Sequence, residues 1–316
     1  MNDAHLLALQ TLFAAGRDRA QQAVELLDAL EDAELERALL RFCTIDAQGM
    51  LQRSALFIAQ RRPDLTETLL LLLSRLPGTA TLEVLNLDGE LMEQLPPEIG
   101  RFGSLKSLSL RDTRVRQLCD ELWGLPLDDL DLSGTELTEI PGLSRLSLTS
   151  LVLGRGASWQ RTPQLTVAPD LSAMPLERLV LHNIGAMPDL SSLNQLCELD
   201  LSLNPFTTLP PLGEPPLVSF VATDTQLRRF PMALTKLDTL EAIDLARTTI
   251  TEVPISIRRL WRLRRLSLAG SPVRTLPESL RHLRRLEVLD VSGTRLKSAE
   301  VDRVQQWLPD CFVIRG

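Results

Sequence analysis

A leucine spacing that recurs ten times dominates this sequence. In the stretch LRRLSLAGSPVRTLPESLRHLRRLEVLDVSGTRL (Leu263–Leu296), leucines stand at offsets 0, 3, 5 and 13, and the pattern restarts 23 residues later. This spacing fits neither the 3.6-residue stripe of a helix nor the two-residue alternation of one strand. Units of the same kind, 20 to 28 residues apart, begin at Leu82, Leu105, Leu127, Leu148, Leu176, Leu196, Leu217, Leu240, Leu263 and Leu286.

Each unit predicts a short strand followed by a return segment. The two leucines of the LxL core lie two residues apart, so they point to the same side of a strand. Proline recurs in the return segments, as at Pro231, Pro254 and Pro277, and opposes a full α-helix there in favour of an extended or 3₁₀ path. One unit cannot bury its leucines alone, but stacked units bury them as a continuous core. The sequence therefore predicts an α/β solenoid of about ten parallel-strand repeats.

The ninth position of the units is polar. Threonine stands there as Thr113, Thr135, Thr225, Thr248 and Thr294, and one unit has asparagine, Asn204. A buried polar group without a hydrogen bond costs about 1–3 kcal/mol. We therefore expect these side chains to bond the backbone of the turn, which makes them structural residues.

The two ends of a solenoid need covering, because their last repeats would otherwise expose the core. We assign residues 1–78 to a helical N-terminal capping domain, residues 79–297 to the repeats and residues 298–316 to a C-terminal cap. This last cap is predicted to be a helix from about Ala299 to Trp307, followed by an apolar strand, Cys311–Ile314, that closes the core.

The repeats that contain LPESLRHLRRLEVLDVSG and LTEIPGLSRL resemble LPX-type leucine-rich repeats, and the chain is similar to the bacterial type III effector-like leucine-rich repeat proteins. This resemblance implies a leucine-rich repeat horseshoe and a bacterial effector or scaffold role. Several such effectors add a ubiquitin-ligase domain. We expect no such domain here, and Cys43, in RFCTID, lacks the CxD arrangement of the cysteine-type ligases.

Composition narrows the setting. The four cysteines are scattered, and no secretory signal precedes them, so we expect a protein made in the cytoplasm with reduced thiols. Translocation into a host cell is left open by the resemblance. The apolar run Leu65–Leu76 is too short to span a bilayer, so no membrane insertion is expected.

Sequence motifs for chemistry are absent. No phosphate-binding glycine motif and no Cys/His cluster occurs, so we expect no cofactor, no metal site and no catalytic residue. A Ser-His-Asp arrangement could be drawn around His182 with Asp200 or Ser202, but strands of this kind bring such residues together by chance.

The concave strand face is the predicted site for a protein partner. Its outward positions are polar and acidic in the middle of the arc, with a basic spot at Arg178 and His182. The period of 28 residues in the fourth unit also predicts a projecting loop, Gly154–Pro175, with Trp159 as an anchor. The candidate partner-binding residues are Asp129, Asp131, Trp159, Arg178, His182, Glu198, Asp200, Asp244 and Arg265. An alternative is that the aspartates only keep the strand face soluble.

Charge is distributed unevenly. Residues 255–316 contain 13 lysines and arginines against six aspartates and glutamates, whereas residues 79–254 contain 13 against 24. The arginines of the last repeats could neutralise phosphates, but the chain as a whole has a net charge of −7, so no nucleic-acid partner is expected. The sequence thus predicts a non-enzymatic protein-interaction module. The alternative is a ubiquitin-ligase-type effector whose activity lies in or beyond the N-terminal helical region.

Overall fold

The computed structural model describes residues 81–90, 92–155, 164–172 and 174–315. The chain divides into two compact units, Met1–Leu146 and Ser147–Gly316, and each is described by itself. The predicted N-terminal capping domain and the anchor Trp159 lie outside the described residues.

The described part of the first unit contains three parallel strands that pair in chain order. They are β1 (Val84–Asn86), β2 (Ser107–Ser109) and β3 (Asp129–Asp131), and the 3₁₀ helices of the returns are η2 (Pro97–Arg101), η3 (Asp120–Gly124) and η4 (Leu143–Arg145). The paired strand residues are 22 or 23 positions apart, as the leucine spacing predicts.

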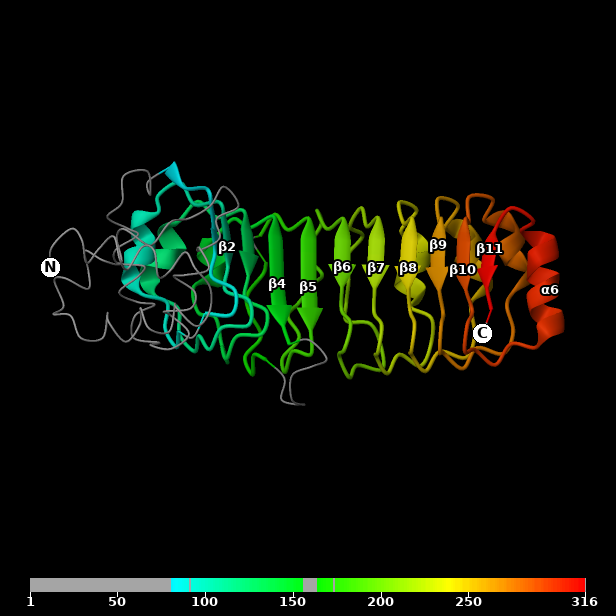
Figure 1. Cartoon of the computed structure of the whole chain (residues 1–316). Coiled ribbons are helices and arrows are strands. Elements are labelled where there is room, and N and C mark those ends of the chain that lie inside the picture. The colour runs from blue at the N-terminus through cyan, green and yellow to red at the C-terminus, as the bar shows by residue number, and fades with distance from the viewer. Residues whose placement is uncertain (1–80, 91, 156–163, 173, 316) are drawn as a thin grey trace, which may run out of the picture. The chain divides into compact units, whose positions relative to one another are not determined.

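The described part of the second unit contains eight strands, and neighbouring strands are parallel and consecutive in the chain (Figure 1). The strands are β4 (Ser150–Gly154), β5 (Arg178–His182), β6 (Glu198–Asp200), β7 (Ser219–Val221), β8 (Ala242–Asp244), β9 (Arg265–Ser267), β10 (Val288–Asp290) and β11 (Phe312–Ile314). The helices are η5 (Met232–Lys236), η6 (Ile255–Arg259), η7 (Glu278–His282) and α6 (Ser298–Trp307).

The leucine pattern forms the core as predicted. In each three-residue strand the central residue is buried, as with Leu199, Leu266 and Leu289, while its two neighbours face the other side of the sheet. A proline at −65 to −74° in φ precedes η5, η6 and η7, which fits the fixed ring geometry of that residue. The returns that follow β5 and β6 contain no described helix, so a 3₁₀ helix, one of the two predicted forms of the return, is present in only some of the described repeats.

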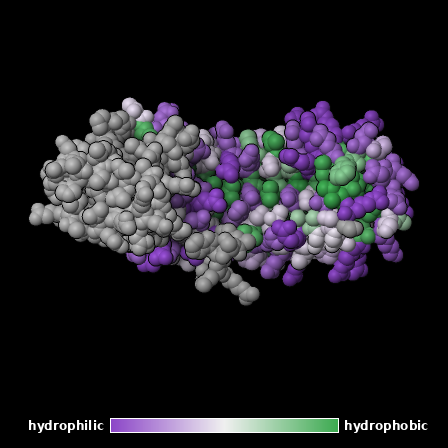
Figure 2. Space-filling view, viewed as in Figure 1, coloured by the Kyte–Doolittle hydropathy of each residue, from purple (hydrophilic) through white to green (hydrophobic). Residues whose placement is uncertain are grey.

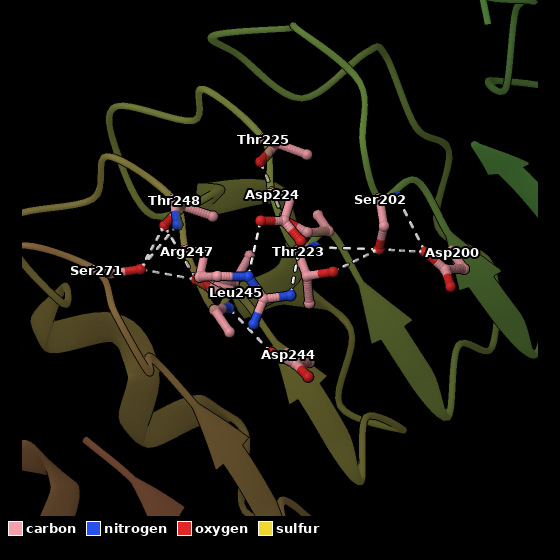
Figure 3. Close-up of polar contacts among 12 residues, drawn as sticks. Asp200, Ser202, Thr223, Asp224, Thr225, Asp244, Leu245, Arg247, Thr248 and Ser271 are labelled. Atoms are coloured by element: carbon pink, nitrogen blue, oxygen red, sulfur yellow. Dashed lines mark hydrogen bonds and ion pairs between the residues drawn. The ribbon is translucent and has the colours of Figure 1, made fainter. Parts of the chain in front are cut away.

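The ninth-position side chains bond the turns as the sequence predicts. Thr225 and Thr248 each donate a hydrogen bond from Oγ1 to the carbonyl oxygen three residues earlier, at 3.0 Å (Figure 3). Asn204 does more, because its amide donates to Leu181 O and Leu201 O while its oxygen accepts the Ile184 N–H at 3.1 Å. Asn204 therefore joins two successive repeats.

Ser271 occupies the same ninth position in its own unit, which the sequence reading missed. It is fully buried and lies 2.9 Å from Thr248 Oγ1. Its hydroxyl oxygen accepts the Thr248 N–H at 3.0 Å and its hydroxyl donates to Leu245 O at 2.9 Å (Figure 3). Ser271 therefore also connects neighbouring repeats. A hydroxyl group at the ninth position can thus make the inter-repeat bonds that the amide of Asn204 makes in its own unit.

The end of the second unit has a helix and a strand where the sequence predicts them, but one residue faces the wrong way. The strand β11 pairs in parallel with β10, and Cys311 and Val313 are buried. Phe312, which we expected to help close the core, is 69% exposed. The alternation of a strand explains the difference, since a residue between two buried neighbours must face outward. Within the described part of the chain, no helix has the length and apolar character to cross a bilayer.

Candidate functional site

The strand side chains of the second unit that point away from the core form two columns, which we call the outer strand face. The starting column consists of the first outward residue of each strand, and the ending column consists of the next outward residue, two positions later. In the parallel register each residue lies beside its equivalent on the neighbouring strand, as Arg178 lies beside Glu198 and Val180 beside Asp200. From β6 to β10 the starting column contains Glu198, Ser219, Ala242, Arg265 and Val288, and the ending column contains Asp200, Val221, Asp244, Ser267 and Asp290. Six of the nine predicted site residues lie on or directly beside this face.

The aspartates of the ending column have a structural task. Asp200 and Asp244 each accept the N–H of the residue two positions later at 2.9 Å, and Asp290 does the same. In Asp200 the same oxygen also accepts a hydrogen bond from the Ser202 hydroxyl at 2.6 Å (Figure 3). One carboxylate oxygen of each aspartate thus accepts the hydrogen bonds of the turn that follows the strand, as aspartate side chains commonly do in turns. The other oxygen remains available to a side chain of a neighbouring strand. Keeping the face soluble is therefore not their only role.

The predicted basic spot is neutralised by the neighbouring strand. Arg178 Nε lies 3.4 Å from Glu198 Oε2, and His182 Nε2 lies 3.0 Å from Asp200 Oδ2. The members of the first pair are 47% and 59% exposed, so this ion pair contributes little stability. The sequence identified all four residues but did not predict that they pair with each other.

Asp200 is the most perturbed acid on this face. Its burial would raise the pKa of the carboxyl, but the facing His182 side chain, 3.0 Å away, and the hydrogen bonds from Ser202 favour the charged form and together outweigh the burial, so the pKa lies below its usual value. The side chain is 28% exposed. Asp200 is therefore held ionised at neutral pH.

The contacts around His182 do not form a catalytic triad. In such a triad the serine hydroxyl bonds the imidazole, and the carboxylate holds the other side of the ring. Here Asp200 lies in the middle, with Ser202 Oγ on one carboxylate oxygen and His182 Nε2 near the other. The imidazole is not placed to take a proton from Ser202, so this cluster cannot activate that hydroxyl.

An apolar depression of about 270 Å³ lies on the outer strand face between β7 and β11. Val221, Ala242, Val288 and Ile314 supply apolar side chains, and all four are partly exposed. The charged residues that border it are Asp244, Arg265 and Asp290. Figure 2 shows hydrophobic surface along the strands of this unit, with hydrophilic side chains above and below it. The sequence reading selected the charged residues and missed the apolar ones between them.

Three of the predicted residues lie elsewhere. Asp129 and Asp131 belong to β3 of the first unit, where Asp129 is exposed and Asp131 accepts the N–H and hydroxyl of Ser133 at 2.8 and 2.6 Å. Trp159 falls outside the described residues. The Gly154 N–H donates a hydrogen bond to the Gln164 side-chain oxygen, so these two described residues, which precede and follow Trp159 in the chain, are bonded to each other.

Elsewhere in the described residues, no group of three or more histidine, cysteine, aspartate or glutamate side chains is placed to hold a metal ion. Burial raises the pKa of the Cys119 and Cys311 thiols, which keeps them protonated. Cys43, the residue relevant to the ligase alternative, lies outside the described residues.

No family model matches the sequence, and no curated protein matches it either. Solved structures do match. The functional domain of InlJ from Listeria monocytogenes is 17% identical with a TM-score of 0.51, over 75% of this chain and 54% of that one. A chain of the Toll–Spätzle complex of Drosophila is 16% identical with a TM-score of 0.57, over 74% of this chain and 38% of that one.

A TDR receptor structure is 17% identical with a TM-score of 0.55, and the match covers 80% of this chain and 44% of that one. This chain thus spans about half, or less, of the length of these three structures. At such identities the likeness concerns the fold. Together with the parallel strands and their leucine core, it shows that the chain has the fold of a leucine-rich repeat solenoid.

Proposed function

We propose that this leucine-rich repeat chain is a non-enzymatic protein-interaction module that binds a partner protein through the outer strand face. The observation that carries the proposal is the apolar depression between β7 and β11, which is bordered by Asp244, Arg265 and Asp290. Protein interfaces commonly combine an apolar centre with a polar rim. The exposed Phe312 adds an aromatic side chain beside this centre, the kind of residue that dominates binding energy in many interfaces.

The size and position of the depression favour a protein over a small molecule. Ligand pockets usually enclose about 300–1,000 Å³ and bury most of their ligand. This depression has about 270 Å³ and lies on the face of a sheet, where it can receive a few side chains of another protein. Asp244 and Asp290 each accept the backbone N–H two residues later, which fixes the turn at the end of their strand. The outer strand face is therefore preorganised, and its binding to a partner costs little conformational entropy.

The charged residues of the proposed surface contribute to the choice of partner. Glu198, Asp200, Asp244 and Arg265 lie on this face, with Arg178 and His182 in pairs with the first two. Because rim charges affect the association rate and specificity more than affinity, we expect them to select the partner. The proposal extends to Asp129 and Asp131 on β3 and to Trp159 in the loop of the fourth unit. The resemblance of the repeats to LPX-type bacterial proteins supports an effector or scaffold setting.

The test compares partner binding by the wild-type full chain and three variants of it. Partner proteins are first identified by pull-down with the wild-type chain from bacterial and eukaryotic lysates, and each is then purified and titrated. Phe312→Ala removes the exposed ring, and Ala242→Arg fills the depression without changing a fully buried residue. Each change is expected to weaken binding about tenfold or more, as for a central interface residue.

Met232→Ala serves as the matched control, because Met232 is 56% exposed and lies on η5, outside both the outer strand face and the loop of the fourth unit. It is expected to bind every captured partner as the wild-type chain does. Circular dichroism would first establish that all three variants are folded. A partner that binds Phe312→Ala and Ala242→Arg with unchanged affinity would reject the outer strand face as the binding surface.

A further inference from the structure

The opposite side of the last repeats carries a second surface of unusual composition. Five arginines stand on η6 or in the turns that lead into β9 and β10: Arg258, Arg259, Arg262, Arg284 and Arg285. Three large apolar side chains accompany them, since Ile255 is 68%, Met232 56% and Trp261 44% exposed. We call these eight residues the return-face patch.

The arginines of the patch have no carboxylate partner within the described residues. Nearby arginines do: Arg264 lies 3.5 Å from Glu241 and 3.0 Å from Glu287, and Arg281 lies 2.5 Å from Glu278. None of the five patch arginines forms an ion pair with a described acidic residue. Their charge is therefore uncompensated locally, in agreement with the excess of basic residues after position 255.

Two of these arginines stack on the tryptophan. The guanidinium carbons of Arg262 and Arg285 lie 4.8 and 5.2 Å from the centre of the Trp261 ring. Such cation–π contacts hold the guanidinium in place while leaving its N–H edges free to bind an anion. The patch thus contains fixed donors rather than mobile side chains alone.

The apolar members of the patch are not needed by the repeat. Ile255 and Met232 are the first residues of η6 and η5, and the corresponding first residues of η7 and η3 are the exposed acids Glu278 and Asp120. Trp261 is the second residue after η6, where the repeats on either side have Asp238 and Arg284. The starts of η5 and η6 adjoin, with Ser256 Oγ 3.9 Å from Met232 Sδ.

We propose that the return-face patch docks the chain peripherally on an anionic lipid bilayer. Clusters of four to eight basic residues bind acidic headgroups, and tryptophan favours the interface between headgroups and acyl chains. The uncompensated arginines match the lipid phosphates, and Ile255 and Met232 enter the apolar boundary. This binding requires no membrane-spanning helix and leaves the outer strand face, on the other side of the sheet, free for a protein.

Single-stranded nucleic acid fits the patch less well. Its binding usually combines arginines with aromatic rings on which bases stack. Here arginines already stack on the Trp261 ring, and the aliphatic side chains of Ile255 and Met232 offer nothing to a phosphate backbone. An acidic protein is another conceivable ligand, but it would need a cluster of carboxylates that matches the positions of the arginines. An anionic bilayer presents a high density of negative charge over its whole surface.

The test is flotation of the full chain with vesicles of phosphatidylcholine alone and with about 30% phosphatidylserine. Binding is expected only to the anionic vesicles and should fall as salt is raised. The double variant Arg258→Gln, Arg259→Gln is expected to lower the partition coefficient about 30-fold, because each basic residue near the surface contributes about fivefold. Ile255→Ser should weaken binding several-fold at every salt concentration.

The matched control is the double variant Arg114→Gln, Arg145→Gln, which removes the same charge from two exposed arginines of the first unit, outside the patch. It should bind anionic vesicles like the wild-type chain. If both double variants lost vesicle binding equally, the attraction would depend on net charge and not on the return-face patch, and this result would overturn the proposal. So would failure to bind the anionic vesicles, an Ile255→Ser variant with unchanged binding, or tighter binding to single-stranded RNA in direct competition.

Discussion

Replacing Asn204 with alanine removes a buried amide that joins two successive repeats. The side chain is 2% exposed, and its oxygen accepts the Ile184 N–H at 3.1 Å. Its nitrogen donates to Leu181 O at 2.7 Å, in the previous repeat, and to Leu201 O and Ser202 O at 2.8 and 3.2 Å, in its own turn. Alanine leaves one buried N–H without this acceptor and three carbonyls without this donor.

The expected loss is counted from the three shortest of these bonds, to Ile184, Leu181 and Leu201. A buried donor left unsatisfied costs about 1–3 kcal/mol, and each lost hydrogen bond to a carbonyl costs about 0.5–1.5 kcal/mol. The free energy of unfolding should therefore fall by about 4 kcal/mol. Thr225→Ala is the comparison, because Thr225 occupies the same ninth position but makes a single bond to Ala222 O, at 3.0 Å. It should cost about 1 kcal/mol.

Urea unfolding followed by far-ultraviolet circular dichroism measures the difference. With a slope of about 3 kcal/mol per molar urea, Asn204→Ala should lower the midpoint by about 1.3 M without changing the slope. Asn204→Thr, which can keep the bond to Leu201 O, should fall between the two alanine variants. If Asn204→Ala proved no more destabilising than Thr225→Ala, the reasoning that the amide couples neighbouring repeats would be refuted.

Two further predictions concern single residues of β4 and β6. Gly154 has a φ of +108°, and a Cβ there would lie 1.8 Å from His182 O, so Gly154→Ala should destabilise the fold by about 3 kcal/mol or more. Gly103→Ala, where a Cβ meets no atom within 4 Å, should change thermal stability by less than about 0.5 kcal/mol; equal midpoints for the two variants would contradict the clash. The lowered pKa of Asp200 should stabilise the folded state above the unfolded pKa of about 4, and this contribution should be lost as pH falls through the folded pKa. Urea titrations of Asp200→Asn should therefore show a shallower loss of stability in acid, and an acid profile identical to that of the wild-type chain would count against the prediction.

The periodic sequence determined the solenoid because its information is local and repeated. The pair of leucines two residues apart requires a strand with one buried side, and the recurrent proline limits the return. Because every unit obeys the same rule, the parallel register and the buried centre of each strand follow without long-range information. The ninth-position hydrogen bonds of Thr225 and Thr248 were predictable for the same reason, since their acceptors lie in the same turn.

The composition of the binding surface was decided only by the tertiary structure. His182 and Asp200, or Val221 and Val288, are far apart in the sequence, and their proximity depends on strand register and side-chain rotamer. A charged surface residue also looks the same in the sequence whether it is paired, as Arg178 on β5 is with Glu198, or free of ion pairs, as Arg258 on η6 is among the described residues. Phe312 illustrates the limit most simply: its hydrophobicity predicted burial, but its place between two buried neighbours turned it to solvent.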